Sequence, residues 1–266
     1  MLLIEAISKA QKSIDIAIFS LTDSQIIDLL NTKAKSGISI SIYYDHKHSS
    51  NLEKKLSPLI SLTKKRKCRL MHHKIIVIDD ELSLLGSTNL TSSSIHYHSN
   101  ILAAIYHPPL AIWLKENFQE GEKNAHFEIE GRFIDLYLMP DKKAIALNSL
   151  LKQIDNANQS IKGSLFSLTH PKIISAISAA KNRGCEVFFS LDKGQGNRDR
   201  NEFPIALSKG YELMHQKNCV IDDQVVMMGS SNWSKSGFKT NQEFFIILTH
   251  LSKNEVKNFT TCMLSK

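Results

Sequence analysis

Apolar residues fall into two kinds of run along this chain, and each kind predicts one kind of element. Short and nearly continuous apolar runs predict buried strands at residues 14–19, 38–44, 161–166 and 185–191. Segments with an apolar residue every three or four positions predict helices at 24–35 and 171–181. Pro171 suits a first helical turn and Gly184 a helix stop. Strands that alternate with helices predict an α/β fold with a mixed sheet.

The pattern occurs twice. Residues 10–21 read Ala-Gln-Lys-Ser-Ile-Asp-Ile-Ala-Ile-Phe-Ser-Leu, and residues 157–168 read Ala-Asn-Gln-Ser-Ile-Lys-Gly-Ser-Leu-Phe-Ser-Leu, 147 positions later. A repeat of this size predicts two similar halves. We assign residues 1–125 to an N-terminal half and 126–266 to a C-terminal half, joined by a helix and a polar turn at 113–132.

The second half opens with an apolar strand at 133–140 that ends in proline. Its counterpart in the first half would lie before Met1. We therefore expect the first half to lack its opening strand and the natural chain to begin upstream. A targeting segment would then lie outside this sequence, in which Met1 leads directly into a helical pattern and no apolar run is long enough to span a membrane.

The composition is that of a basic soluble protein. The 266 residues include 33 Lys and Arg against 26 Asp and Glu, a formal net charge of +7. A basic surface fits a phosphate-bearing partner, either nucleic acid or an anionic membrane, although such a charge also occurs in proteins that bind neither. The four cysteines show neither zinc-ligand spacing nor a disulfide framework, and we expect free thiols at Cys68, Cys185, Cys219 and Cys262.

A second duplicated pattern carries the chemistry. Residues 72–79 read His-His-Lys-Ile-Ile-Val-Ile-Asp, and Gly-Ser-Thr-Asn follows at 86–89. Residues 215–222 read His-Gln-Lys-Asn-Cys-Val-Ile-Asp, and Gly-Ser-Ser-Asn follows at 229–232, after the same gap. Because side chains alternate along a strand, the histidine and lysine of each copy share a face. The aspartate that ends each apolar run is expected to be a turn residue.

Each half thus supplies an imidazole, an ammonium, an amide and a hydroxyl, which we expect near the start of a helix. This set suits a phosphodiester substrate, because lysine and asparagine can hold the non-bridging oxygens in the transition state. One histidine can attack phosphorus and form a phosphohistidine, and the other can protonate the leaving oxygen. We expect no metal or cofactor, since the lysines supply the positive charge. One His-x-Lys on a strand usually has no function, but the complete pattern occurs here twice.

The pattern H-x-K-x4-D-x6-G-S-x-N, present twice, resembles that of the phospholipase D superfamily over nearly the whole chain. The resemblance implies two similar α/β halves related by a pseudo-twofold axis, each a mixed sheet flanked by helices, with the active site between them. The catalytic residues implied by the resemblance are His72, Lys74, Asn89, His215, Lys217, Asn232 and Glu243. The supporting residues implied are Asp79, Ser87, Asn100, Asp222 and Ser230.

The two halves differ downstream of the motifs. Members of the family often place an acidic residue there to orient the histidine, and Glu243 lies 28 residues after His215. The same count from His72 leads to Asn100. Since a carboxylate favours a charged imidazole, we hypothesise that His72, beside Asn100, is the neutral nucleophile and that His215, beside Glu243, is the general acid. The alternative is that Asn100 weakens the first half.

Several other features remain open. The basic run at 64–67 is either a solvated face or a site that recruits nucleic acid or anionic lipid, and the polar loop at 192–200 is a candidate for shaping the substrate cleft. We expect Trp233 to pack in the core. We expect the remaining histidines near the first motif at the surface, without metal-ligand spacing: His46, His48, His73, His96 and His98.

Three functions are therefore compatible with the sequence. The favoured one is a monomeric, metal-independent phospholipase D-like enzyme that acts on phospholipids, in the cytoplasm or peripherally at a membrane. The first alternative is a nuclease of the same superfamily, and the second is a catalytically weak binding protein. Two motifs in one chain favour the lipid enzyme, because the small nucleases of the superfamily generally carry one motif and dimerise.

Overall fold

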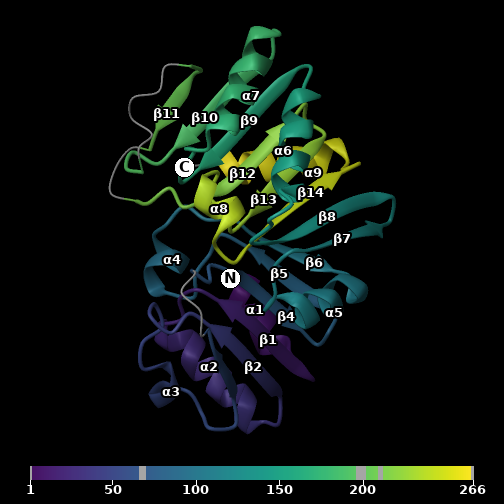
Figure 1. Ribbon diagram of the computed structural model, residues 1–266. Helices are drawn as coiled ribbons and strands as arrows, with labels where there is room; N and C mark the ends of the chain where they lie inside the picture. The colour runs from purple at the N-terminus through teal and green to yellow at the C-terminus, as the bar shows by residue number, and fades with distance from the viewer. Residues whose placement is uncertain (1, 66–69, 196–201, 209–211, 265–266) are drawn as a thin grey trace. The chain divides into compact units, whose positions relative to one another are not determined.

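The computed structural model describes residues 2–65, 70–195, 202–208 and 212–264 (Figure 1). The chain divides into two units. One comprises Met1–Tyr97 and Leu102–Gly121, and the other comprises His98–Ile101 and Glu122–Lys266. Each unit has its own hydrophobic core. The four-residue segment His98–Ile101 therefore belongs to the second unit, although its neighbours in the sequence on both sides belong to the first.

The first unit is built on a six-stranded mixed sheet of order β3-β2-β1-β4-β5-β6. Its strands are β1 (Ser13–Ile18), β2 (Ser39–Tyr44), β3 (Ser61–Lys64), β4 (Lys74–Ile78), β5 (Leu82–Gly86) and β6 (Leu102–Tyr106). Its helices are α1 (Leu2–Lys9), α2 (Ser24–Lys35), α3 (Leu52–Lys55), α4 (Ser92–His96) and α5 (Pro108–Asn117). The strands β1 to β3 are parallel, and β4 to β6 run antiparallel to their neighbours.

The second unit repeats this order and extends it. Its eight-stranded sheet has the order β11-β10-β9-β12-β13-β14-β8-β7. Its strands are β7 (Lys123–Ile129), β8 (Arg132–Met139), β9 (Ser160–Leu165), β10 (Glu186–Leu191), β11 (Ile205–Leu207), β12 (Lys217–Ile221), β13 (Val225–Gly229) and β14 (Glu243–Thr249). Its helices are α6 (Ile145–Asp155), α7 (Pro171–Asn182), α8 (Lys235–Lys239) and α9 (Lys253–Leu264). In the second unit, β14 pairs with β8. In the described residues of the first unit, β6 takes the place of β14 and forms the edge of the sheet.

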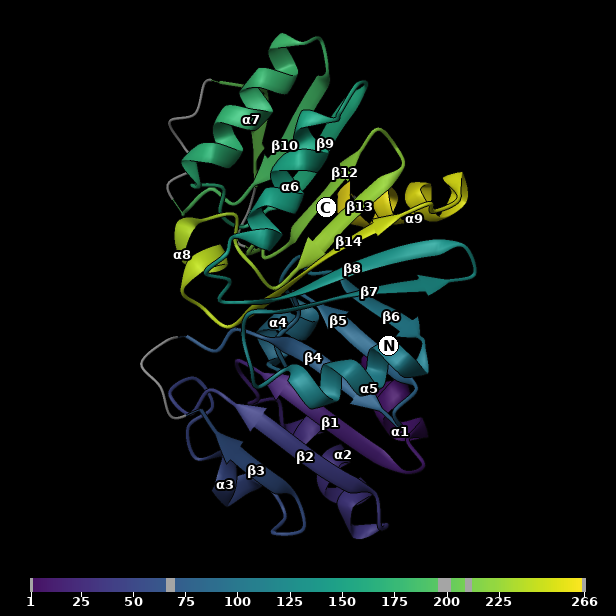
Figure 2. The ribbon, with the colours of Figure 1, turned by 45° about the vertical axis from the view of Figure 1, so that its right-hand side comes forward.

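Helices cover both faces of each sheet. In the second unit, Ile161 and Leu165 of β9 share a core with α6 and α7, while Ser164, on the other face of the strand, bonds to Met263 of α9. In the first unit, Ile14 of β1 shares a core with α1 and α2, and Asp15 faces Lys115 of α5. Figure 2 shows α6 and α7 lying over β9 and β10. The prediction of two α/β units with mixed sheets flanked by helices is therefore confirmed.

The segment after α5 differs from the prediction of a polar turn. The strand β7 occupies Lys123–Ile129 and forms a hairpin with β8, which is visible in Figure 2. Its residues alternate between exposed and half-buried positions, so it lacks the continuous apolar run by which the other strands were recognised. The interpretation of residues 113–132 as a helix followed by a polar turn holds as far as residue 122 and is wrong from Lys123, where β7 begins.

Candidate active site

In the second unit, strand pairing brings the second motif against an aromatic ring. Lys217 pairs with Leu165 at the end of β9, and the backbone N–H of Phe166 then donates to Gln216 at 2.7 Å. The ring of Phe166 lies 5.2 Å from that of His215, and the Lys217 Nζ lies 4.9 Å from its centroid. His215 and Lys217 are 8% and 1% exposed. Nζ of Lys217 also donates to the backbone carbonyl of His215, so imidazole and ammonium are held side by side.

The first unit builds the same arrangement independently. Lys74 pairs with Ile18 at the end of β1, and Phe19 contacts His72 at 4.9 Å between ring centroids. Nζ of Lys74 lies 5.1 Å from the Phe19 centroid and donates to the His72 carbonyl at 2.7 Å. Both motif side chains are buried. The two phenylalanines were not predicted as site residues, although both stand in the repeated Phe-Ser-Leu string that revealed the two halves.

The motif asparagines lie in loops rather than at helix starts. Asn89 and Asn232 follow β5 and β13, and the short helices after them begin at Ser92 and Lys235, capped by Thr91 and Ser234. Each helix thus begins three residues after the motif asparagine, so the amides lie near a helix start, as expected, but not within the helix. Within the described part of the chain, Oδ1 of each asparagine is buried and has no hydrogen-bond partner. A buried amide atom without a partner is uncommon, and here it recurs at equivalent positions.

Ser230 holds Glu243 at the start of β14. Oγ of Ser230 donates to Glu243 Oε2 at 2.6 Å and accepts the backbone N–H of Phe244 at 3.0 Å. Nδ2 of Asn241 lies 3.3 Å from the other carboxylate oxygen. Glu243 is fully buried, so its orientation depends on these contacts. Ser87, at the equivalent position in the first unit, is also buried.

Asn100 lies beside His215, whereas residue counting paired it with His72. Its Oδ1 is 3.1 Å from Nδ1 of His215. The hypothesis that paired Asn100 with His72 assumed that each half supplies the partner of its own histidine. Instead, the chain between α4 and β6 enters the second unit as the segment His98–Ile101, and Asn100 enters with it.

Ser99 fixes this segment to the second motif. Its backbone N–H donates to Leu213 and its carbonyl accepts from His215, both at 2.9 Å. Its hydroxyl accepts from Nε2 of Gln216 at 2.8 Å. Ser99 and Gln216 are buried, as is Asn218, which donates to Oε1 of Gln216 at 3.0 Å. Neither Ser99 nor Gln216 was identified from the sequence, because serine and glutamine carry no signal without their tertiary partners.

Asp79 and Asp222 are structural residues, as expected for turn positions. The carboxylate of Asp222 accepts the backbone N–H groups of residues 158–160 at 2.8 Å, and that of Asp79 accepts those of residues 11–13. Burial alone would raise the pKa of each carboxyl group, but the backbone N–H donors outweigh burial and lower both pKa values. Each aspartate therefore fixes the start of β1 or β9.

His73 is completely buried, so the prediction of a surface position is wrong for this residue. By the alternation of side chains leading into β4, it faces away from His72, and neither ring nitrogen has a hydrogen-bond partner within the described ranges. Burial lowers its pKa to about 3, and the charge of Lys74 adds to this effect. His98 is half-buried, and its pKa is lowered by burial and then by the charge of Lys217. Both rings are therefore neutral at physiological pH.

The remaining sequence features fall in three groups. Trp233 is buried against Phe189, as predicted. Lys64 pairs with Glu53, whereas residues 66 and 67 of the basic run, residues 196–200 of the polar loop, and Cys68 lie outside the described residues. Among the described cysteines, Cys185, Cys219 and Cys262 form no disulfide bond with one another.

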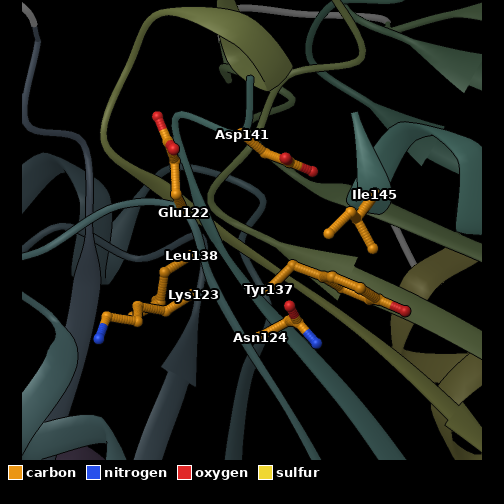
Figure 3. A pocket seen from close by; sticks show the side chains of 7 residues that line it. All are labelled: Glu122, Lys123, Asn124, Tyr137, Leu138, Asp141 and Ile145. Atoms are coloured by element: carbon orange, nitrogen blue, oxygen red, sulfur yellow. The ribbon is translucent and has the colours of Figure 1, made fainter. Parts of the chain in front are cut away.

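The described residues offer few other candidate sites. They contain no cluster of three or more potential metal ligands, and no helix among them is long and apolar enough to cross a membrane. Figure 3 shows a pocket of the second unit between the β7–β8 hairpin and the start of α6, lined by Glu122, Lys123, Asn124, Tyr137, Leu138, Asp141 and Ile145. None of the motif residues lines it.

Comparison with known proteins gives a family match over most of the chain. Residues 3–121 and 150–262 both match the family described as "Cardiolipin synthase, PLD-like domain". A mitochondrial cardiolipin hydrolase from Chlamydomonas reinhardtii is 24% identical over 121 residues, which cover 44% of this chain and 54% of that protein. A probable cardiolipin synthase, YwiE, from Bacillus subtilis is 22% identical over 92% of this chain and 59% of its own length.

The chain thus spans little more than half the length of these two curated relatives. Among solved structures, the phosphatidylserine synthase of Haemophilus influenzae superposes with a TM-score of 0.79 at 12% identity, covering 98% of this chain and 82% of that one. At this level of identity the likeness concerns the fold alone.

Proposed function

Because the chain belongs to the phospholipase D superfamily, we propose that it cleaves a phosphodiester bond of a phospholipid through a phosphohistidine intermediate. The family match itself supports the broader class of phosphodiesterases and phosphatidyltransferases. The observation that carries the proposal is the geometry that recurs in both units. In each, a buried histidine and lysine pack on one phenylalanine ring, and the asparagine of the same motif carries a buried amide atom without a partner.

The groups present can perform the reaction in two steps. In the first, a ring nitrogen of one motif histidine attacks phosphorus, so an N–P bond forms and the bond from phosphorus to the leaving oxygen breaks. The other motif histidine gives its proton to that oxygen. In the second step, water or an alcohol attacks phosphorus, the N–P bond breaks, and the second histidine takes the proton. Lys74, Lys217, Asn89 and Asn232 hold the non-bridging oxygens and stabilise the charge of the transition state.

The contact of Asn100 with His215 supports a choice of nucleophile. An amide oxygen accepts only from a protonated nitrogen, so Nδ1 of His215 donates and the neutral ring keeps its lone pair at Nε2. The argument that a neutral partner marks the nucleophile therefore applies to His215 rather than to His72. We accordingly assign nucleophilic attack to His215 and proton transfer to His72.

Trapping of the intermediate tests this assignment. Acid-free quenching followed by peptide mass spectrometry is expected to find the phosphoryl adduct on His215. The variant His72→Asn should still form the adduct slowly when the leaving group is a good one, such as p-nitrophenol, because such a group departs without protonation. His215→Asn should form none. An adduct on His72 would reverse the assignment.

The substrate class is tested by comparing two kinds of substrate. The protein is incubated in EDTA with vesicles of cardiolipin or phosphatidylcholine and, separately, with plasmid DNA. We expect release of a lipid head group without nicking, and loss of that activity in Lys217→Met. The names of the curated relatives, a cardiolipin hydrolase and a cardiolipin synthase, support cardiolipin as the first lipid to test. Nicking without lipid turnover would instead identify a nuclease. No activity on either substrate would favour a binding protein.

A further inference from the structure

A histidine outside the two motifs shares the aromatic ring on which the first motif packs. The rings of His48 and Phe19 are 4.1 Å apart between centroids and tilted by 33°. The same Phe19 ring contacts His72 and Lys74. His48 is thus one aromatic ring away from two proposed catalytic groups, although it lies 24 positions before His72 in the sequence.

Asp45 holds the His48 ring in one orientation. Nδ1 of His48 is 2.8 Å from Asp45 Oδ1. Because a carboxylate only accepts hydrogen bonds, Nδ1 carries the hydrogen, and the neutral ring presents its lone pair at Nε2. Across the described ranges of the chain no group is bonded to Nε2, and the side chain is 36% exposed. In the neutral form of the ring this nitrogen is a hydrogen-bond acceptor open to a ligand.

The turn that carries this ring is fixed on both sides. The Asp45 carboxylate also accepts the backbone N–H of Met71, the residue before His72, at 3.4 Å. The hydroxyl of the buried Ser49 donates to the Phe19 carbonyl at 3.2 Å, and the hydroxyl of the partly buried Ser20 donates to the His48 carbonyl at 2.8 Å. His48 therefore has a defined position relative to Phe19 and the first motif.

The second unit provides an internal comparison. Its Asp192 occupies the position of Asp45 and makes the same connection, with Oδ2 accepting the backbone N–H of Met214, the residue before His215, at 3.3 Å. Three residues after Asp192 stands Gln195, which is exposed and has a positive φ of 45°. In the second unit the aspartate thus bonds to the residue before the motif histidine without a histidine three positions after it. Support of the motif by the aspartate therefore does not explain why His48 is present in the first unit.

We infer that His48 accepts a hydrogen bond from a hydroxyl of the alcohol that is exchanged at phosphorus, and thereby favours a polyol such as glycerol over a simple alcohol. The inference rests on the proposed function. In a two-step exchange the leaving alcohol and the incoming alcohol occupy the same position, so one acceptor serves both. His48 contacts a hydroxyl that does not react, and the covalent steps are those already given. The ligand class is a glycerol-like head group.

A competition between two alcohols tests the inference. The full chain is incubated with the phospholipid that it cleaves and with equal concentrations of glycerol and 1-propanol, and the two phosphatidyl products are quantified by mass spectrometry. The variant His48→Ala is expected to lower the ratio of glycerol product to propanol product by about three- to tenfold, the effect of one lost hydrogen bond. His48→Gln, whose amide oxygen can accept from a hydroxyl, should recover part of the ratio.

The product ratio does not depend on the amount of folded enzyme, so loss of stability alone leaves it unchanged. His46→Ala is the matched control, since His46 is an exposed histidine two residues away, and its ratio should equal that of the wild type. An unchanged ratio in His48→Ala overturns the inference, and so does hydrolysis of the lipid without transfer to either alcohol. Absence of any lipid turnover in the wild type contradicts the proposed function instead.

Discussion

Nδ1 of the buried His215 imidazole donates to the amide oxygen of Asn100. An amide fixes the ring orientation without adding charge, and the hydroxyl and backbone of Ser99 hold that amide in place. The neighbouring ammonium of Lys217 adds a positive charge beside the same ring. At the scale of single residues, this environment suits a nucleophile that works as the neutral base.

Replacing the amide by a carboxylate tests that conclusion. In Asn100→Asp the new carboxylate favours the charged form of His215. His215 then loses its proton only at higher pH. The acidic limb of the profile of kcat/KM against pH should therefore move upward by about one pH unit. The measurement is initial rate over a pH series at low substrate concentration.

Asn100→Ala serves as the control for this substitution. It removes the acceptor without adding charge, so the rate should fall while the acidic limb moves much less than in Asn100→Asp. A downward movement of the limb in Asn100→Asp would contradict the assignment of His215 as the neutral nucleophile.

At the scale of elements, one aspartate in each unit determines where the central strand begins. Asp79 and Asp222 follow the motif strands β4 and β12, adopt positive φ, and accept backbone N–H groups at the start of β1 and β9. Since β1 and β9 lead into Phe19 and Phe166, the aspartates also position the rings on which the motif residues pack. This explains their place in the repeated pattern without any contact with a substrate.

The pH dependence of stability should report this role. Asp222→Asn is expected to lower the free energy of unfolding at pH 7 by about 1–3 kcal/mol, because charged acceptors bind backbone donors more strongly than neutral ones. The folded-state pKa of Asp222 is below the ordinary value of 3.8. Its stabilisation is therefore complete above that value and is lost as the pH falls below it. The difference between variant and wild type, measured by urea unfolding, should shrink over this acidic range.

Asp223→Asn is the matched control, because Asp223 also has a positive φ but is exposed. It should change the unfolding free energy by no more than about 0.5 kcal/mol. An equal loss in both variants would mean that the backbone turn, rather than the bonds to residues 158–160, determines the effect.

At the scale of the whole molecule, two units with separate cores repeat one strand order and one motif geometry. The family match covers both, at residues 3–121 and 150–262. The proposed mechanism requires one histidine from each motif in a single reaction. If the two motifs formed independent sites, each site would need only the histidine of its own motif.

Single substitutions distinguish these possibilities. We expect both His72→Asn and His215→Asn to lower kcat on a phospholipid by about 100-fold or more, the loss typical of removing a general acid or a nucleophile. Retention of about half of the wild-type rate in either variant would instead indicate two sites that act separately. Circular dichroism and thermal unfolding of the variants check that the fold is intact.

Local patterns were sufficient for much of the fold. Apolar runs identified β1, β2, β9 and β10 within about one residue, and the bounds of α2 agree with the prediction, because these elements are buried and each follows its own periodicity. The edge strand β7 was not predicted, because it alternates between exposed and half-buried residues. The prediction that His73 lies at the surface was wrong because side chains alternate along an extended chain, so His73 faces away from its neighbours His72 and Lys74.

The sequence by itself determined the repeat, the α/β class and the candidate histidines, lysines and asparagines, since each of these depends on residue type and spacing along the chain. Tertiary structure alone decided which side chains are neighbours. It placed Asn100 beside His215 through a segment that leaves the first unit, and it set Phe19 against both His48 and His72. Counting residues could not give these contacts, because they join positions whose separation in sequence carries no information about their distance in space.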